Sequence, residues 1–208
     1  YTDSFWSSSG EVKNGQIDGK VTLYNAENGK PSYVFDYKNN VQEGSCTQYY
    51  DNGSLFRVST YKKGRIDGEA KSYWPNGKLK SISNYQMGKP SIGLKEFDEK
   101  GNEIVFPEII FKEINNLRAS NKYFVEISLS DKSDIDFYMG DLIEGKYLSR
   151  NISKLSVNEG VARMEYSAYQ GLTSSRDLKI IAKRKTTYGN TLILYKKKTI
   201  VIPNAYKN

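Results

Sequence analysis

The residue types that most often carry catalysis or bind metals are scarce in this chain. Its 208 residues include no histidine and a single cysteine, Cys46. Imidazole general bases, His-ligated zinc, multi-cysteine metal clusters and internal disulfides are therefore excluded. A Gly-x-Ser-x-Gly nucleophile elbow is absent, and no context singles out a carboxylate pair of the glycosidase kind. We predict a protein that is not an enzyme and has no cofactor and no metal.

Acidic residues cluster in one segment of the second half, where they could gather around a hard cation. Counted from Asp131, however, the sixth position is Asp136 instead of the glycine of a calcium-binding EF-hand, and the twelfth is Leu142. We therefore expect solvated loop carboxylates. The cluster consists of Asp131, Asp134, Asp136, Asp141 and Glu144.

Basic residues are concentrated near the end of the chain. The net charge of +7 divides into +1 for residues 1–105 and +6 for residues 106–208. A row of lysines could form an anion-facing patch for a glycan, lipid headgroups or nucleic acid. It could equally be a set of solvated side chains that protect a sheet edge from aggregation, which is the interpretation we favour. The row consists of Lys179, Lys183, Arg184, Lys185, Lys196, Lys197 and Lys198.

Adjacent aromatic residues form the third candidate site. The chain has 17 Tyr, 8 Phe and 2 Trp. Such residues could form a cation cage, as in choline-binding modules, or they could be packing residues of a sheet. Their recurrence at a fixed spacing favours packing, so we expect binding mainly at positions that differ between repeats, such as Phe56, Arg57 and Arg65. The candidate binding residues are Tyr49, Tyr50, Phe56, Arg57, Arg65, Tyr73 and Trp74.

A period of 24 residues organises the first half of the chain. Gly29, Gly53, Gly77 and Gly101 follow one another at this step, and Asn precedes the first three. Agreement of many positions at one period predicts a repeat array. Other positions with the same step are Tyr37, Tyr61 and Tyr85; Tyr49, Tyr73 and Phe97; and Tyr50 and Trp74.

Each repeat predicts a β-hairpin, because Asn-Gly readily takes the positive φ of a tight hairpin turn. Residues 64–68 are expected to form a wider link between hairpins, and residues 1–13 a lead-in with a flexible Ser-Gly segment. About four hairpins would join edge to edge into one antiparallel sheet. The expected strand pairs are 20–25 with 31–37, 45–50 with 55–61, 69–74 with 79–85, and 94–97 with 103–106.

Residues 61–79 have the pattern Tyr-x-x-Gly-x-x-x-Gly, then two aromatic residues, then Asn-Gly-Lys-Leu. This pattern resembles the bacterial variant of the membrane occupation and recognition nexus (MORN) repeat, and the resemblance covers residues 14–105. It implies a hairpin array used for binding or scaffolding. Bacterial proteins with this repeat are often labelled antitoxin-like, and MORN repeats accompany some lipid kinases. This chain has no Gly-rich phosphate loop and no kinase catalytic loop.

The period stops at about Pro107, and a different pattern follows. About seven short strands separated by polar turns predict an immunoglobulin-like β-sandwich over residues 106–208. Residues 109–118 could instead form a short helix, because Ile110, Ile114 and Leu117 share helical spacing. The expected strands are 109–112, 123–129, 135–139, 147–149, 161–166, 178–185 and 192–202.

The sequence thus predicts an all-β protein with a lead-in (1–13), a MORN-like array of antiparallel hairpins (14–105) and a β-sandwich (106–208). We expect a noncatalytic binding or scaffolding protein whose partner is a protein, and no sequence-specific binding of nucleic acid. Two alternatives stay open: an antitoxin or immunity-like protein that binds a toxin, and an envelope module for anionic glycan or lipid. The chain begins with Tyr1, as after removal of a signal peptide, so we expect export to the bacterial periplasm or cell surface, with the cytoplasm as the alternative.

Overall fold

The structure, a computed structural model, describes residues 7–204 and divides after Ile104 into two compact units. We call residues 7–104 the repeat unit and residues 105–204 the sandwich unit. Both consist of antiparallel strands, and the one helix in the described part has four residues. No described helix is long and apolar enough to cross a membrane. The prediction of an all-β fold is confirmed.

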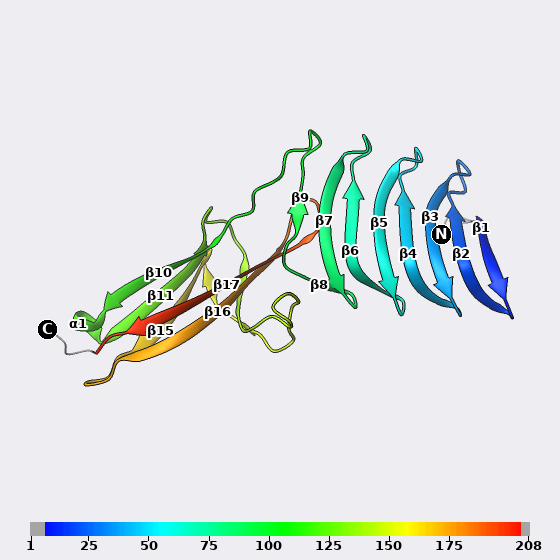
Figure 1. The fold of residues 1–208 in the computed structure, drawn as a ribbon. Helices are drawn as coiled ribbons and strands as arrows, with labels where there is room; N and C mark the ends of the chain where they lie inside the picture. Colours follow the sequence, from blue (N-terminus) through cyan, green and yellow to red (C-terminus); the bar gives the residue numbers. More distant parts are fainter. Residues whose placement is uncertain (1–6, 205–208) are drawn as a thin grey trace, which may run out of the picture. The chain divides into compact units, whose positions relative to one another are not determined.

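The repeat unit is one antiparallel sheet of nine strands. Strands β1 to β8 lie in chain order, and β9 pairs with β7 (Figure 1). Every strand therefore pairs with neighbours that are close in sequence, so the predicted hairpin array is confirmed. The strands are β1 (Ser7–Lys13), β2 (Gln16–Tyr24), β3 (Pro31–Lys38), β4 (Val41–Tyr49), β5 (Leu55–Lys62), β6 (Arg65–Tyr73), β7 (Leu79–Gln86), β8 (Lys89–Pro90) and β9 (Lys95–Glu96).

The predicted Asn-Gly turns close the hairpins at one end of the sheet. The Gly53 N–H donates to the Tyr50 carbonyl and the Gly77 N–H to the Trp74 carbonyl, both at 2.8 Å. Gly77 has a φ of 81°, which glycine adopts without the clash that a Cβ would cause. The chain therefore forms the Asn-Gly turns that the sequence predicts.

The wider link predicted at residues 64–68 is wrong. Only Lys63 and Gly64 separate β5 from β6, because β6 already begins at Arg65. Gly68 lies inside β6 with a φ of 92° and stands opposite Tyr85 of β7. Glycine adopts such a positive φ without the clash that a Cβ would cause.

The two ends of the array also differ from expectation. Ser7–Lys13 lies within the predicted lead-in, yet it forms β1 and pairs with β2; residues 1–6 lie outside the described part of the chain. At the other end, the predicted strand pair 94–97 and 103–106 is reduced to β9 and a bridge between Phe97 and Glu103. β8 has only two residues, and beyond it the Ser91 N–H still donates to the Asn84 carbonyl at 2.9 Å.

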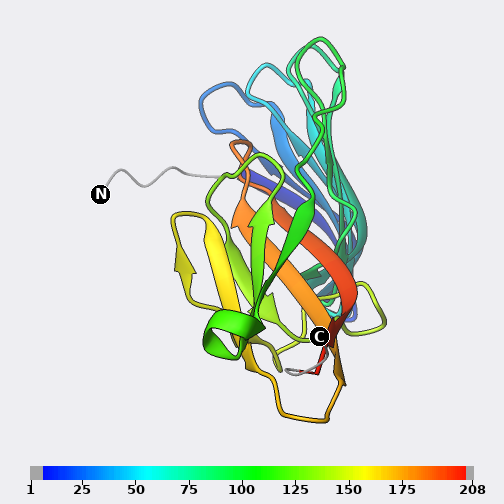
Figure 2. The same ribbon diagram turned by 90° about the vertical axis from the view of Figure 1, so that its left-hand side faces the viewer.

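The two faces of the repeat sheet differ in burial. The buried residues in its described strands lie on one face, which we call the inner face, and include Cys46 (1% exposed), Ser59 (4%) and Ala70 (1%). Thr47 and Val58 point to the opposite, outer face and are half-buried. The sheet of this unit is bent (Figure 2), and bending crowds the side chains on the inner side. Small residues are thereby buried within a single-layer sheet.

The sandwich unit contains two four-stranded antiparallel sheets, ordered β10-β11-β15-β14 and β13-β12-β16-β17. Labelled in chain order as strands A to G with an added C′, these are the sheets ABED and C′CFG of an immunoglobulin-like domain. The predicted sandwich is confirmed. The strands are β10 (Ile109–Asn116), β11 (Lys122–Leu129), β12 (Asp136–Met139), β13 (Ser153–Lys154), β14 (Val157–Asn158), β15 (Val161–Ser167), β16 (Ser174–Lys185) and β17 (Thr191–Ile202).

One hydrophobic core lies between these two sheets. Alternate residues of β11, from Tyr123 to Leu129, are buried against residues of β12, β16 and β17. Phe137 on β12 is 0% exposed. It occupies strand C, where antibody domains bury a tryptophan against a disulfide, and here apolar packing alone fills that position.

The predicted strand at 109–112 is confirmed and extends to Asn116, and α1 (Leu117–Ser120) begins only after it, so the alternative of a helix over residues 109–118 is wrong. Two other details correct the sequence-based expectations. The predicted strand 147–149 is wrong, since Tyr147 makes only an isolated bridge to Ile143. Strands β13 and β14 were not predicted, because two residues are too few to show a periodic pattern.

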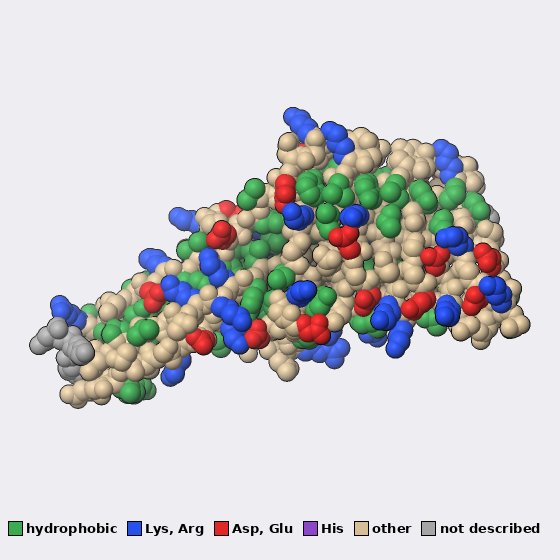
Figure 3. Space-filling view, in the orientation of Figure 1, with side chains coloured by type: hydrophobic (Ala, Val, Ile, Leu, Met, Phe, Trp, Pro, Cys, Tyr) green, Lys and Arg blue, Asp and Glu red, His purple; other side chains and the backbone are tan. Residues whose placement is uncertain are grey.

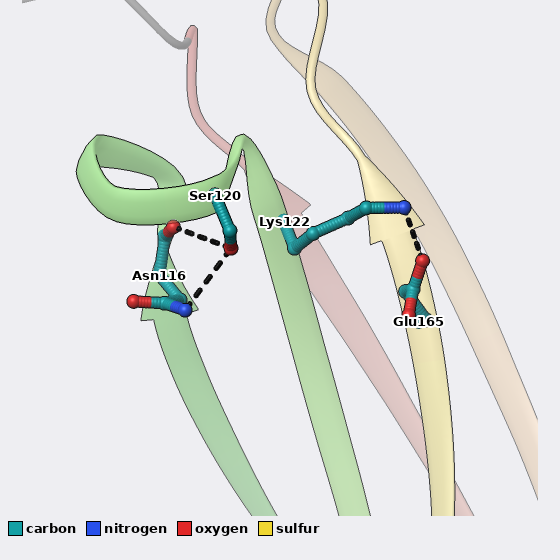
Figure 4. Close-up of polar contacts among 4 residues, drawn as sticks. All are labelled: Asn116, Ser120, Lys122 and Glu165. Atoms are coloured by element: carbon teal, nitrogen blue, oxygen red, sulfur yellow. Dashed lines mark hydrogen bonds and ion pairs between the residues drawn. The ribbon is translucent and has the colours of Figure 1, made fainter.

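Helix α1 is a single turn that connects β10 to β11. The Ser120 hydroxyl donates to the Asn116 carbonyl at 3.2 Å, and the Asn116 side-chain amide donates to the Ser120 hydroxyl at 3.0 Å (Figure 4). Asn121, with a φ of 58°, ends the helix in the left-handed conformation. Lys122 then pairs with Glu165 of β15 (Figure 4). These polar contacts hold the connection between adjacent strands.

The buried ring of Phe137 provides a test of the sandwich core. We expect Phe137→Ala to lower the free energy of unfolding by about 3–5 kcal/mol, because it removes apolar contacts and leaves a cavity. Met139→Ala on the same strand, at a side chain that is 40% exposed, is the control and should cost less than about 1.5 kcal/mol. Urea unfolding measures both, and equal losses would contradict the assignment of Phe137 to the core.

Candidate functional site

The inner face of the repeat unit gathers large side chains from three successive repeats. Alternation along the strands places residues 33, 35 and 37 of β3 on this face, together with 57, 59 and 61 of β5 and 81, 83 and 85 of β7. In β3 all three are aromatic, whereas β7 has two serines. We call the large residues the inner-face cluster: Tyr33, Phe35, Tyr37, Arg57, Tyr61 and Tyr85.

The aromatic residues of β3 form one continuous group. The Tyr33 and Phe35 rings are stacked, with centroids 5.5 Å apart and planes at 4°. Phe35 meets Tyr37 edge to face at 6.2 Å and 73°. Both geometries are favourable for aromatic pairs. All three residues are only half-buried, so the group remains accessible on the sheet surface.

Arg57 lies in the middle of the same face, opposite Gln48 and Ser72. Its guanidinium carbon is 5.9 Å from the centroid of the Tyr85 ring. Its Nε is shielded from solvent and has no hydrogen-bond partner. Among the ion pairs within residues 7–104, none includes Arg57. A buried donor without a partner costs about 1–3 kcal/mol, and because the Nε itself is shielded, an incoming acceptor would have to contact the outward part of this half-buried guanidinium.

Two ionisable neighbours of Arg57 are held in their neutral forms. Burial raises the pKa of the Tyr61 hydroxyl, and the nearby Cys46 raises it further while Arg57 opposes the shift. Burial likewise raises the pKa of the Cys46 thiol, which the hydrogen bond from Ser59 partly offsets. A buried thiol with a raised pKa is a poor nucleophile. The inner face therefore offers aromatic rings and a guanidinium, with its thiol and the Tyr61 hydroxyl in their neutral forms.

The predicted binding residues Tyr50 and Trp74 connect one repeat to the next. The Tyr50 hydroxyl donates to the Tyr73 carbonyl at 2.7 Å, and the Trp74 Nε1–H donates to the Phe97 carbonyl at 3.0 Å. Tyr50 meets Phe56 edge to face at 5.0 Å, and Lys80 lies 4.3 Å from the centroid of the Trp74 ring. Because the same brace recurs 24 residues later, these side chains have a structural role in the array.

The seven predicted residues do not form a single site. Phe56 is the unpaired residue at which the register between β4 and β5 shifts, and its ring meets that of Tyr50. Arg65 is exposed at the first position of β6, beside the two-residue turn at the opposite end of the sheet from the Asn-Gly turns. Tyr49 and Tyr73 are the last residues of β4 and β6. Of the seven, the structure places only Arg57 in the inner-face cluster.

Sequence reasoning missed the aromatic members of the cluster. The 24-residue period predicts only that Tyr37, Tyr61 and Tyr85 recur, and it does not single out Tyr33 and Phe35. The available signal was the alternation of residues 33, 35 and 37 combined with the 24-residue step, which places Tyr33, Arg57 and Ser81 at equivalent positions. The inner face therefore differs between repeats at these equivalent positions, where one repeat has Tyr33, the next Arg57 and the next Ser81.

The predicted basic row is divided between two faces and largely paired. Lys179 contacts Asp141 at 2.5 Å, Lys198 contacts Glu113 at 2.7 Å, and Lys196 contacts Glu108 at 3.4 Å. The remaining members have other contacts: Arg184 with the Ser133 hydroxyl, Lys185 with the Gly189 carbonyl, and Lys197 with the Tyr195 ring, while Lys183 lines a pocket. On the face in Figure 3, basic and acidic side chains of this unit are interspersed. The row therefore does not form one continuous patch of positive charge.

The predicted acidic cluster is also dispersed. Asp131 accepts hydrogen bonds from Ser133, Asp136 pairs with Lys154 at 2.7 Å, and Asp141 contacts Lys179 and Tyr195. The bonds from Lys179 and Tyr195 hold the pKa of Asp141 far below its usual range. Within residues 7–204, no group of three or more suitable side chains could hold a metal ion.

One open pocket of about 350 Å³ lies in the sandwich unit. Its charged lining has both signs, because two carboxylates and two basic groups contribute to it. The residues are Asp134, Ile135, Asp136, Val157, Lys183 and Arg184. Several of these groups already have partners within the protein, so the pocket selects no particular ligand charge.

Comparison with known families identifies the repeats. A family model described as the MORN repeat variant matches residues 42–63 and 66–87. These segments contain the hairpins β4–β5 and β6–β7, and the match agrees with the resemblance found in the sequence. None of the curated proteins searched matches the chain. MORN repeats suggest a binding or scaffolding role for the array.

The inter-repeat brace of Trp74 can be tested by removing its donor. We expect Trp74→Phe to lower the free energy of unfolding by about 1–3 kcal/mol, because the Phe97 carbonyl loses its indole donor and some packing is lost. Tyr50→Phe removes only a hydroxyl and should cost about 0.5–1.5 kcal/mol. Chemical denaturation provides the comparison, and an unchanged stability in both variants would show that the braces are dispensable.

The sandwich unit should lose stability at high pH. Burial and a hydrogen bond to Glu113 raise the pKa of Tyr123 to about 12, and similar contacts with Asp141 raise that of Tyr195 to about 12. Because the folded pKa values exceed the ordinary value of 10.0, this stabilisation is complete below about pH 10 and is lost as pH rises toward 12. Urea titrations at about pH 8 and about pH 11 should show a smaller alkaline loss for Tyr123→Phe than for the parent. An identical alkaline loss in this variant would refute the assignment.

Proposed function

We propose that the protein is a noncatalytic binding module that docks a partner protein on the inner-face cluster, at the bacterial cell envelope. The repeat match suggests binding or scaffolding as the general role. The envelope location extends this proposal from the sequence resemblance, and fractionation of native cells tests it separately.

The observation that carries the proposal is the combination of accessible aromatic rings with the half-buried guanidinium of Arg57, which takes part in none of the ion pairs within residues 7–104. Tyrosine and arginine are enriched among the residues that dominate protein–protein binding energy. Tyr33, Phe35 and Tyr37 supply rings that are already ordered by mutual packing, so little side-chain entropy is lost on binding. Arg57 supplies a donor that lacks an acceptor within the repeat unit.

The antitoxin or immunity-like alternative is a special case of this proposal, in which the partner is a toxin. The glycan or lipid alternative has less support, because the basic row that suggested it is split and mostly paired with the protein's own acceptors. The identity of the co-purifying molecule distinguishes the two: a stoichiometric protein, or a polymer or membrane fraction.

The proposal predicts which substitutions release the partner. In affinity purification from the native organism, we expect the parent chain to retain a stoichiometric protein and a double variant Tyr33→Ala, Arg57→Ala to lose it, with an affinity at least about 30-fold lower. The control variant is Arg65→Ala, which removes the same charge from an exposed residue away from the inner face. Circular dichroism verifies folding. Retention of the partner by the folded double variant would exclude the inner face as the docking site.

A further inference from the structure

We infer that the partner places a carboxylate against the guanidinium of Arg57, so that the docking segment is an acidic stretch of polypeptide. This inference rests on the proposed function, since it specifies the chemistry of the group that meets the inner-face cluster. It concerns Arg57 and its surroundings alone, and each step depends on contacts within the repeat unit.

The first step is that the repeat unit's own carboxylates are committed elsewhere. Asp36 pairs with Lys20 at 3.2 Å and accepts the Ser45 N–H at 3.0 Å. Glu43 accepts the Lys63 N–H at 2.7 Å, in one of the turns. The other two near β6 behave in the same way: Asp67 accepts the Met87 N–H, and Glu69 pairs with Lys71. Glu96, on the inner face, is 1% exposed and has interactions of its own.

The second step is that Arg57 is desolvated but not enclosed. Its Nε is shut off from water, whereas the residue as a whole is only half-buried, so part of the side chain still faces outward. The Tyr85 ring lies 5.9 Å away and lowers the local polarity on one side. An ion pair formed in such surroundings is stronger than one between fully hydrated side chains. A planar guanidinium also matches a carboxylate in a two-bond geometry that an amide or hydroxyl cannot equal.

The third step is the position of the aromatic group relative to Arg57. Tyr33 lies on β3 and Arg57 on β5, in one row across the sheet with Gln48 of β4 between them. Two strand spacings separate them by about 10 Å. A peptide in the polyproline II conformation rises about 3.1 Å per residue and repeats every three residues, so it crosses this distance in about three residues with both side chains on the same side. We therefore expect an acidic residue and an apolar residue three positions apart, the first against Arg57 and the second against the Tyr33 and Phe35 rings.

A matched pair of peptides tests the inference without the native partner. The probes are acetyl-(Leu-Ser-Ser-Glu)3-amide and the same peptide with Gln in place of Glu, titrated into the full chain while the Arg57 Nε–Hε resonance is followed by NMR. We expect the Glu peptide to shift this resonance and to bind about tenfold more tightly than the Gln peptide. The preference should vanish in Arg57→Gln and persist in the equally charged control Arg65→Gln. Arg57→Lys, which keeps the charge but loses the planar fork, should retain only part of it.

Several results would overturn the inference. They are equal binding of the two peptides, no shift of the resonance up to about 10 mM peptide, or a preference that survives in Arg57→Gln. A hyaluronate oligosaccharide forms a separate arm: if it shifts the Arg57 resonance and the Glu peptide does not, the carboxylate belongs to a glycan and the polypeptide assignment is wrong. If the peptides fail this test but the Tyr33→Ala, Arg57→Ala variant still loses the native partner, the inner face remains the docking site. Only the inference of an acidic docking segment is then wrong.

Discussion

Backbone pairing between neighbouring hairpins is the constraint on which the repeat unit depends. A two-stranded hairpin is at best marginally stable in water, so each repeat needs the ladder on either side of it. The strands pair in chain order from β1 to β8, and side-chain braces repeat with the same step. Stability in such an array is approximately a sum over repeats and their interfaces. Residues that serve the ladder and the braces therefore have to recur, whereas the remaining positions can change.

This division explains why the inner face can be both structural and specific. Tyr37, Tyr61 and Tyr85 recur, and each stands opposite a glycine of the preceding strand. Two positions before these tyrosines, the successive repeats have Phe35, Ser59 and Ser83. Four positions before them, they have Tyr33, Arg57 and Ser81. The constant tyrosines maintain the face, and the variable positions determine what it recognises. Arg57 has no counterpart in the other two repeats, and its Nε lacks a partner.

The sandwich unit uses its charges differently. It holds the larger excess of positive charge in the sequence, yet several of its basic side chains, among them Lys179, Lys198 and Arg184, meet carboxylates or hydroxyls of the same unit. Its stability comes from one core between two sheets, in which Phe137 replaces the disulfide-packed tryptophan of antibody domains. Exposed ion pairs of this kind contribute little to stability, about 0–1 kcal/mol each, but they place carboxylates beside the lysines of β16 and β17 and so interrupt the positive charge there.

The sequence by itself determined the repeat length, the Asn-Gly turns, the order of hairpins and the immunoglobulin-like pattern, because these follow from local turn chemistry and alternation. It could not determine the roles of Gly68, which looked like a linker residue and lies within β6, or of Ser7–Lys13, which looked flexible and joins the sheet. Both outcomes depend on backbone pairing with a neighbouring strand, which is β7 for Gly68 and β2 for Ser7–Lys13. Only the tertiary structure decided that Arg57 shares a face with Tyr33 and Tyr85 while Phe56 and Trp74 do not, and that the lysines of β16 and β17 have partners. Register across strands brings residues 24 and 28 positions apart into one surface, and no local pattern records which of them are left without a partner.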